Sequence, residues 1–308
     1  MRYTNPYKMP DSIYRACAPA DQHKPDPKRI GVTTLISPVQ IRSLTMKHWD
    51  EIEVDASARL WAVLGEGVHL VMDKYSPPKD KEQLNRKLEF VIGDMTIVGI
   101  VDTFDIKDTG IIEDHKCTSV YSFLLGVKQE WTEQLNVYAW LAEKNGIHIK
   151  GLKINAFLRD WQASKANYGT KIGDGGEIER WGTPRQTDYP KIPFQSVDIP
   201  LWPLNKIEEF VRFRLAEHQK CVILCTDEER WRRPEVWAVM KKGRKSAVAC
   251  NSYLDGDKIP FTKEDAEKWM RTNAKKGEDL YLEQRKGACI RCQSYCQVAN
   301  FCKQNKGE

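Results

Sequence analysis

The alternation of apolar and polar residues is most regular over 55–117. Apolar residues recur three and four positions apart over 55–74, which predicts an amphipathic helix. β-branched residues then dominate 97–106, and a second short run over 111–117 has the same character. The turn-forming residues Lys-Asp-Thr-Gly over 107–110 separate the two runs, which predicts an antiparallel hairpin.

Three further segments complete the predicted core. Apolar residues repeat at helical spacing over 131–141, and Asn145-Gly146 is typical of a helix end. A strand is predicted at 147–158 and another helix at 205–220. Helix, hairpin, helix and strand in this order are typical of an α/β architecture.

The rest of the chain is predicted to be less regular. Residues 1–30 are polar and proline-bearing, which predicts an irregular N-terminal arm. Gly31 begins a short β-like segment that ends at Ile36. The glycine- and proline-rich stretch 159–200 predicts a long loop excursion from the core domain at 31–220. Residues 221–308 then form a basic and helical region, expected to close onto the core.

The predicted hairpin places three chemically active side chains together. Residues two apart on a strand share a face, so Asp114 and Lys116 do, and Asp102 lies almost opposite Asp114. Two close carboxylates repel unless a cation lies between them, and Mg²⁺ or Mn²⁺ prefers carboxylate ligands. Lys116 can orient or deprotonate a water, or offset charge on a phosphate. An exposed hairpin with solvated charges is the alternative interpretation.

Five motifs follow one another along the chain: Gly65-x-x-x-His69, Glu89, Asp102, Asp114-x-Lys116 and Gln134-x-x-x-Tyr138. Their order resembles the RecB-like branch of the PD-(D/E)XK nucleases, over about residues 31–160. Val101 stands where the family name has its proline. The resemblance implies an α/β fold with a restriction-endonuclease-like core, in which helices flank a mixed central sheet.

The resemblance also implies roles for these residues. The ligands of the Mg²⁺ or Mn²⁺ would be His69, Asp102, Asp114 and the backbone carbonyl of His115. Glu89 would support those ligands. The catalytic group would comprise Asp102, Asp114, Lys116, Gln134 and Tyr138. From the helix spacing alone, Gln134 and Tyr138 are expected to reach one phosphate or base, although Tyr138 is equally well explained as a core residue.

Composition narrows the class of protein. The chain has 308 residues with 41% apolar content, enough to bury a large core. A net charge of +5 is modest, so any nucleic-acid contact must use local clusters. Neither a long apolar run nor a charged-then-apolar leader is present, so a cytoplasmic protein without a membrane partner is expected. For a phage-encoded protein that would be the host cytoplasm.

Nine cysteines, four of them crowded near the C-terminus, favour reduced thiols and a metal over disulfides. The spacing Cys289-x2-Cys292-x3-Cys296-x5-Cys302 suits a soft-metal site, and zinc would use all four thiols. The resemblance instead favours a 4Fe-4S iron–sulfur cluster that clamps the C-terminal segment. Its ligands would be Cys292, Cys296 and Cys302 with either Cys225 or Cys289 as the fourth.

Cations and tryptophans alternate over 229–245, a mixture that suits a phosphate backbone with stacked bases. A hairpin with a solvated basic turn explains the same pattern. The candidate nucleic-acid-binding residues are Arg230, Trp231, Arg232, Arg233, Lys241, Lys242, Arg244 and Lys245.

These observations predict a metal-dependent hydrolase that cleaves DNA phosphodiesters at single-stranded or duplex ends. By resemblance it would be an exonuclease of the CRISPR-associated or phage recombination type, acting in recombination, repair or phage DNA processing. A protein partner from a recombination or CRISPR-type system would fit such a role. A structure-specific endonuclease on the same core and a non-catalytic DNA-binding or assembly protein are the alternatives.

Overall fold

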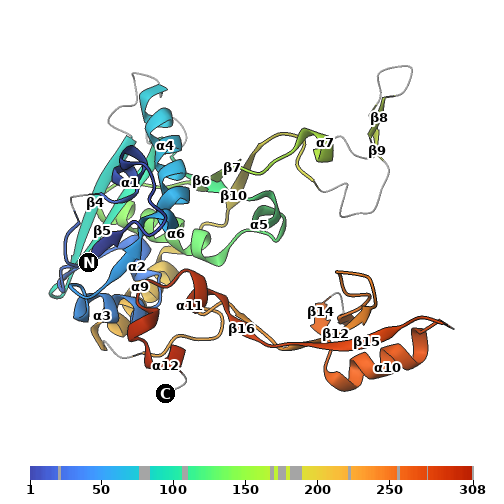
Figure 1. Ribbon diagram of the computed structural model, residues 1–308. Coiled ribbons are helices and arrows are strands. Elements are labelled where there is room, and N and C mark those ends of the chain that lie inside the picture. The colour runs from blue at the N-terminus through green and yellow to red at the C-terminus, as the bar shows by residue number, and fades with distance from the viewer. Residues whose placement is uncertain are drawn as a thin grey trace. The chain divides into compact units, whose positions relative to one another are not determined.

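The chain divides into two compact units, Met1–Ile223 and Leu224–Glu308, and each is described by itself. Figure 1 draws the computed structural model with the elements of both units labelled. The structure describes residues 1–19, 22–75, 84–105, 110–166, 170–172, 178–180, 189–220, 223–254, 257–275 and 277–306.

A six-stranded mixed sheet forms the centre of the first unit, with strand order β10-β7-β6-β5-β2 and β4 paired with β5. Its strands are β2 (Arg29–Gly31), β4 (Leu84–Ile92), β5 (Met95–Asp105), β6 (Ile111–Thr118), β7 (Gly151–Leu158) and β10 (Phe194–Ile199). β6 runs parallel to β7, whereas β5 is antiparallel to both β4 and β6. The predicted hairpin is therefore the β5–β6 pair; its turn at 106–109 lies outside the described residues.

The strands β5 and β6 pair over a short length and then separate. Their register runs from Asp105 opposite Ile111 to Thr103 opposite Glu113. β4 pairs along β5 on one edge, so β2 and β6 share the other edge, and β2 takes the part from Thr96 to Val98. β6 meanwhile stays paired with β7 as far as Thr118. A fork thus opens between β5 and β6 immediately beyond the Thr103 pair.

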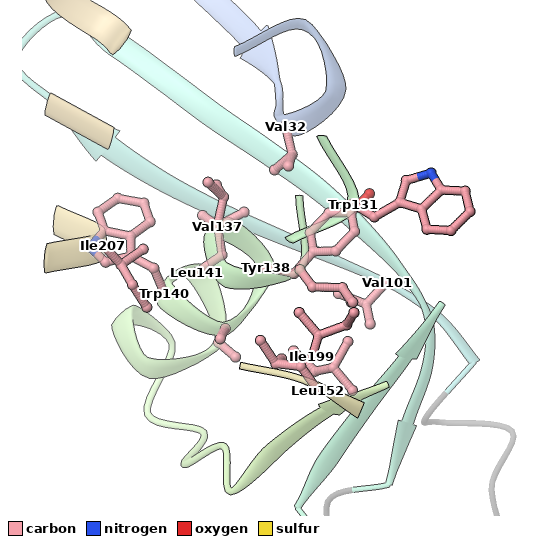
Figure 2. Close-up of a cluster of buried hydrophobic side chains, with 14 of the residues drawn as sticks. Val32, Val101, Trp131, Val137, Tyr138, Trp140, Leu141, Leu152, Ile199 and Ile207 are labelled. Atoms are coloured by element: carbon pink, nitrogen blue, oxygen red, sulfur yellow. The ribbon is translucent and has the colours of Figure 1, made fainter. Parts of the chain in front are cut away.

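Helices cover the sheet, as Figure 1 shows, and α6 (Gln129–Lys144) contributes more buried side chains to the apolar cluster than any other described element. α6 also contacts α9 (Leu204–Lys220). Figure 2 shows Tyr138 and Leu141 of α6 within this apolar cluster. A Cβ at Gly99 of β5 would lie 2.8 Å from a Leu141 methyl and 2.9 Å from the Tyr138 ring. Glycine is required there because α6 packs directly onto the strand.

The predicted helix over 55–74 is present as η1 (Ala56–Arg59) followed by α4 (Leu60–Tyr75). α4 contacts β6, yet none of its residues is buried. Its exposed large apolar residues are Leu60, Trp61, Leu64, Leu70, Val71 and Tyr75. The periodicity predicted the helix correctly, but the apolar positions do not form a core face.

The segment predicted as an irregular arm contains regular structure, so that prediction is wrong. β1 (Arg2–Thr4) pairs with β3 (Glu53–Asp55) in a parallel register, and α1 (Asp11–Cys17) follows β1. The β-like segment after Gly31 is a helix, α2 (Val32–Leu35), and α3 (Val39–Lys47) comes next. Elements of three to nine residues are too short to establish a period.

The predicted loop excursion also includes ordered elements. α7 (Ala163–Ala166) and the pair β8 (Thr170–Ile172) and β9 (Ile178–Arg180) lie within it. β10 closes one edge of the central sheet by pairing with β7, which corrects the prediction of a loop as far as 200. Residues 167–169, 173–177 and 181–188 are outside the described part of the chain.

The second unit is built on β12 (Val236–Lys241) paired with β15 (Leu280–Arg285). α10 (Lys263–Asn273) begins at a Thr262 capping box, and its Ala266 packs with Val239. The remaining elements are β11 (Arg232–Arg233), β13 (Asn251–Leu254), β14 (Asp257–Pro260), β16 (Ala288–Cys289), α11 (Ile290–Ser294), η3 (Ala299–Phe301) and α12 (Lys303–Lys306). Among all described residues, no helix is long and apolar enough to cross a membrane.

Candidate active site

Two carboxylates stand where the β5–β6 fork opens. Thr103 opposite Glu113 is the last paired position, so Asp102 and Asp114 are the first residues beyond it. The backbone N–H of His115 donates to Asp102 Oδ2 at 3.0 Å, a bond that continues the link between the strands through a side chain. The predicted opposition of Asp102 and Asp114 is therefore present, and the local strand geometry produces it.

Helix α4 brings His69 to the same fork. His69 Nδ1 lies 3.4 Å from Asp102 Oδ2, and the charge of His69 also acts on Asp114. Its ring centroid is 6.1 Å from that of His115. Asp102 thus links the strand pair to the helix.

Lys116 completes the group from the far side of Asp114. Its Nζ lies 2.7 Å from Asp114 Oδ2 and donates to Gln134 Oε1 at 3.0 Å. Gln134 Nε2 in turn donates to the Tyr138 hydroxyl at 3.1 Å. Both residues are buried and one turn apart on α6. Both ends of the Gln134 amide are thus engaged inside the protein, so the expectation that they reach a phosphate or base is not met in this arrangement.

The electrostatics of the fork are dominated by burial. Burial raises the pKa of Asp114 to about 6; Lys116 opposes the rise, while the Asp102 charge adds to it. Asp114 Oδ2 is fully buried, and the Lys116 ammonium lies 2.7 Å from it. Burial also raises the pKa of the Tyr138 hydroxyl. Ionising Asp114 is therefore costly unless additional positive charge is present.

The donor types at the fork fit a hard divalent cation. Carboxylate oxygens are suitable ligands for Mg²⁺ or Mn²⁺, and Asp114 Oδ2 is a buried carboxylate oxygen that lies 2.7 Å from the Lys116 ammonium. Across the described residues, no group of three or more His, Cys, Asp or Glu side chains is already arranged as a ligand set. The Lys116 ammonium and the His69 imidazole are the groups that contact the two carboxylates, at 2.7 Å from Asp114 and 3.4 Å from Asp102.

Glu89 lies elsewhere, and the prediction that it supports the metal ligands is wrong. It stands on β4 opposite Val98, four residues before Asp102 along β5, which corresponds to about 13 Å. Glu89 forms ion pairs with Arg29 and Lys87, and hydrogen bonds from Lys87 and Arg29 lower its pKa. Motif order does not determine how far apart two strands place their side chains.

The His115 side chain was not predicted to belong to the site; only its carbonyl was. Its Nε2 lies 3.3 Å from Thr103 Oγ1, while its buried Nδ1 has no hydrogen-bond partner among the described residues. Burial lowers the pKa of this imidazole. The sequence signal was a histidine inside a strand between Asp114 and Lys116, and strand alternation directs it to the opposite face from theirs.

Several of the predicted nucleic-acid-binding cations in the second unit are engaged with the protein itself. Three form ion pairs: Arg232 with Asp227 at 3.3 Å, Lys241 with Glu278 at 2.9 Å and Lys242 with Asp279 at 3.5 Å. Arg230 hydrogen-bonds with the Cys292 sulfur, Trp231 packs under Arg291, and Arg244 donates to Ser246. Arg233 and Lys245 are exposed. Three of the seven predicted cations therefore have a carboxylate partner among the described residues.

Four thiols of the second unit interact with one another. Burial raises the pKa of Cys225 to about 12, and the charges of Glu229, Cys302, Cys296 and Cys292 raise it further. Burial likewise raises the pKa of Cys296, with contributions from Cys292 and Cys302. Gln304 holds the Cys225 backbone through two hydrogen bonds of 3.1 and 2.8 Å. The described cysteines are free thiols, so these four are available to a metal.

Comparisons with known proteins add little to this picture. No family model matches the sequence, and no curated protein matches it. A solved structure described as "Crystal structure of SSO0001" covers 66% of this chain and 83% of its own, with 15% identity and a TM-score of 0.42. A likeness at this level assigns neither a fold family nor a function.

Proposed function

We propose that the first unit is a metal-dependent DNA nuclease of the RecB-like PD-(D/E)XK type, acting as an exonuclease. The observation that carries the proposal is the convergence of His69, Asp102, Asp114 and Lys116 at one strand fork. Two carboxylates, an imidazole and a lysine from three separate elements meet there. A structural role alone does not account for it, because burying Asp114 beside Asp102 raises the cost of ionising Asp114.

The proposal gives each side chain a task. His69, Asp102 and Asp114 hold the Mg²⁺ or Mn²⁺, and the ion, when bound, polarises a phosphoryl oxygen and lowers the pKa of a bound water. Lys116 offsets negative charge on the phosphate or orients the water. Gln134 fixes the Lys116 ammonium through the 3.0 Å hydrogen bond, and Tyr138 fixes Gln134.

For the second unit we propose a 4Fe-4S cluster, with zinc as the alternative, held by Cys225, Cys292, Cys296 and Cys302. The mutual charge interactions of these thiols support Cys225 over Cys289 as the fourth ligand. Cys289 instead acts on Arg230. Metal–thiolate bonds would contribute directly to the folding free energy of this short C-terminal segment.

The nuclease proposal is tested with purified full-length protein and end-labelled linear DNA, single- and double-stranded, beside a closed circle. We expect Mn²⁺-dependent release of short products from linear DNA and an intact circle. Lys116→Ala should lose this activity at an unchanged circular dichroism spectrum. Lys153→Ala is the matched control. Lys153 lies on the adjacent strand β7, outside the fork, and its ammonium lies 3.8 Å from a carboxylate oxygen of Asp198 rather than from Asp114.

Three results would count against the proposal. Opening of the circle would replace the exonuclease with an endonuclease. Inert wild-type protein on every substrate would remove the enzyme claim. Equal activity of the Lys116→Ala variant and wild type would show that the fork is not where cleavage occurs.

A further inference from the structure

An exposed tryptophan with a cation stacked on it lies on the helix that bears His69. Trp61 is in the first turn of α4 and remains 63% exposed. The Arg159 guanidinium carbon lies 4.4 Å from the Trp61 ring centroid. Arg159 is itself exposed and forms no ion pair with a carboxylate among the described residues.

This pair is connected to the fork by three elements. Arg159 directly follows β7, and its backbone N–H donates to the Thr118 carbonyl at 3.0 Å. Thr118 ends β6 two residues after Lys116. His69 follows Trp61 by eight residues on α4, which corresponds to about 12 Å along the helix axis. The pair therefore flanks the site at a separation of a few nucleotides.

The chemistry of the pair suits a nucleic-acid strand. An indole face stacks on any base, and a guanidinium binds phosphate and adds a cation–π contribution. Within a duplex each base is covered by its neighbours except at the terminal pair, whereas every base of an unstacked single strand offers its face. An exposed cation without a carboxylate partner also favours an anionic ligand over an apolar protein surface.

We propose that Trp61 and Arg159 form a binding site for single-stranded nucleic acid, with a base stacked on the indole and a phosphate on the guanidinium. The site would hold the strand a few nucleotides from the Lys116 end of β6. This inference rests on the proposed nuclease function, and it identifies the substrate of that nuclease as a single strand. Its binding test does not require cleavage.

The chain offers a matched control at the other end of the same helix. Tyr75 is 74% exposed, and the Lys74 ammonium lies 5.2 Å from its ring centroid. Both residues belong to α4, so this pair does not connect the helix to the strands of the fork. Trp61→Ala and Tyr75→Ala therefore remove equally exposed rings, of which only one is placed beside β6 and β7.

The test measures binding of fluorescein-labelled oligothymidylate and of a blunt duplex by anisotropy, with Ca²⁺ replacing Mg²⁺. We expect Trp61→Ala to weaken single-strand affinity by about 5- to 150-fold, the range for losing one stacked base. Trp61→Phe should retain most of the affinity, and Tyr75→Ala all of it. Arg159→Ala should lower the slope of log affinity against log salt by about 0.7.

A strand with one abasic position locates the contact. At the stacked position, the abasic strand should bind wild type as weakly as the intact strand binds Trp61→Ala, and the two losses should not add. Unchanged single-strand affinity in Trp61→Ala would overturn the inference and leave this face to a protein partner. An equal loss in Tyr75→Ala would overturn it as well.

The two proposals fail in different ways. A wild-type protein that never cleaves DNA with Mn²⁺ but binds single strands through Trp61 removes the nuclease and keeps the binding site. If the wild-type protein cleaves DNA but Trp61→Ala binds single strands as tightly as wild type, the binding site is removed and the nuclease proposal is kept.

Discussion

Gln134 Oε1 accepts a hydrogen bond from Lys116 Nζ at 3.0 Å, and this bond joins α6 to the strand that carries the candidate catalytic lysine. Gln134 is buried, and its amide nitrogen is fixed on the Tyr138 hydroxyl. The ammonium is thereby held between an amide oxygen and the Asp114 carboxylate. A lysine with two fixed partners is preorganised, whereas a free lysine side chain would have to be ordered at each turnover.

The first prediction concerns this positioning. Gln134→Ala removes a hydrogen bond to a charged group, so we expect cleavage to slow by about 10- to 150-fold, since such bonds contribute about 1.5–3 kcal/mol. Tyr138→Phe should have a smaller effect, because it leaves the Lys116 contact intact. Single-turnover cleavage rates measure both. A larger loss in Tyr138→Phe than in Gln134→Ala would show that the glutamine does not act through Lys116.

The second prediction concerns pH. The folded-state pKa of Asp114 is about 6, above its ordinary value of 3.8, so the folded state favours the neutral carboxyl. The free-energy cost of ionising Asp114 in the folded state is absent below pH 3.8. It grows as the pH rises from 3.8 to about 6, and it is complete above about 6. Without metal at about pH 8, Asp114→Asn should therefore stabilise the fold by about 2–3 kcal/mol.

Urea unfolding with a metal chelator present provides the measurement. The stability gain of Asp114→Asn should shrink towards zero when the pH is lowered to about 3, because wild-type Asp114 is then mostly neutral in both states. A destabilised Asp114→Asn protein at high pH would mean that the Lys116 ion pair outweighs burial.

The third prediction separates the candidate ligands of the cysteine cluster. Cys225→Ser should lose bound iron and visible absorption, or bound zinc if the sample is colourless. Cys289→Ser should keep its metal, because the proposed ligands are Cys225, Cys292, Cys296 and Cys302. Metal content by mass spectrometry gives the answer, with Cys250→Ser as a control outside the group. Full metal content in Cys225→Ser would assign the fourth position to another residue.

The fourth prediction links packing to the site. Gly99→Ala places a methyl group against Tyr138 and Leu141, so we expect a loss of about 1–3 kcal/mol of unfolding free energy. Gly67→Ala on α4 meets no atom within 4 Å and should stabilise the protein by up to about 1 kcal/mol. Urea midpoints compare the two. Equal stability of both variants would show that α6 does not pack tightly on β5.

The longer helices and strands were predictable from the sequence. α4, α6, β5 and β6 extend over eight or more residues, so their apolar spacing is unambiguous. Within the β5–β6 hairpin, strand alternation placed Asp114 beside Lys116 and opposite Asp102. These local relations needed no knowledge of the remaining fold.

Relations between distant segments were not predictable in the same way. Glu89 lies on β4, and the β4–β5 register places it opposite Val98. Lys241 forms an ion pair with Glu278, which the pairing of β12 with β15 brings close to it. α4 has the expected period and still buries none of its residues. Each outcome depends on which strands and helices pack against one another. The local pattern of residues in a single sequence does not determine that packing.

The most direct test of a metal-centred fork is the stoichiometry of Mn²⁺ binding, followed by electron paramagnetic resonance of the free ion during titration. We predict one Mn²⁺ for each wild-type chain, retained in Lys116→Ala and lost in Asp114→Asn. A wild-type protein that binds no Mn²⁺, or an Asp114→Asn variant that binds it as tightly, would contradict the account.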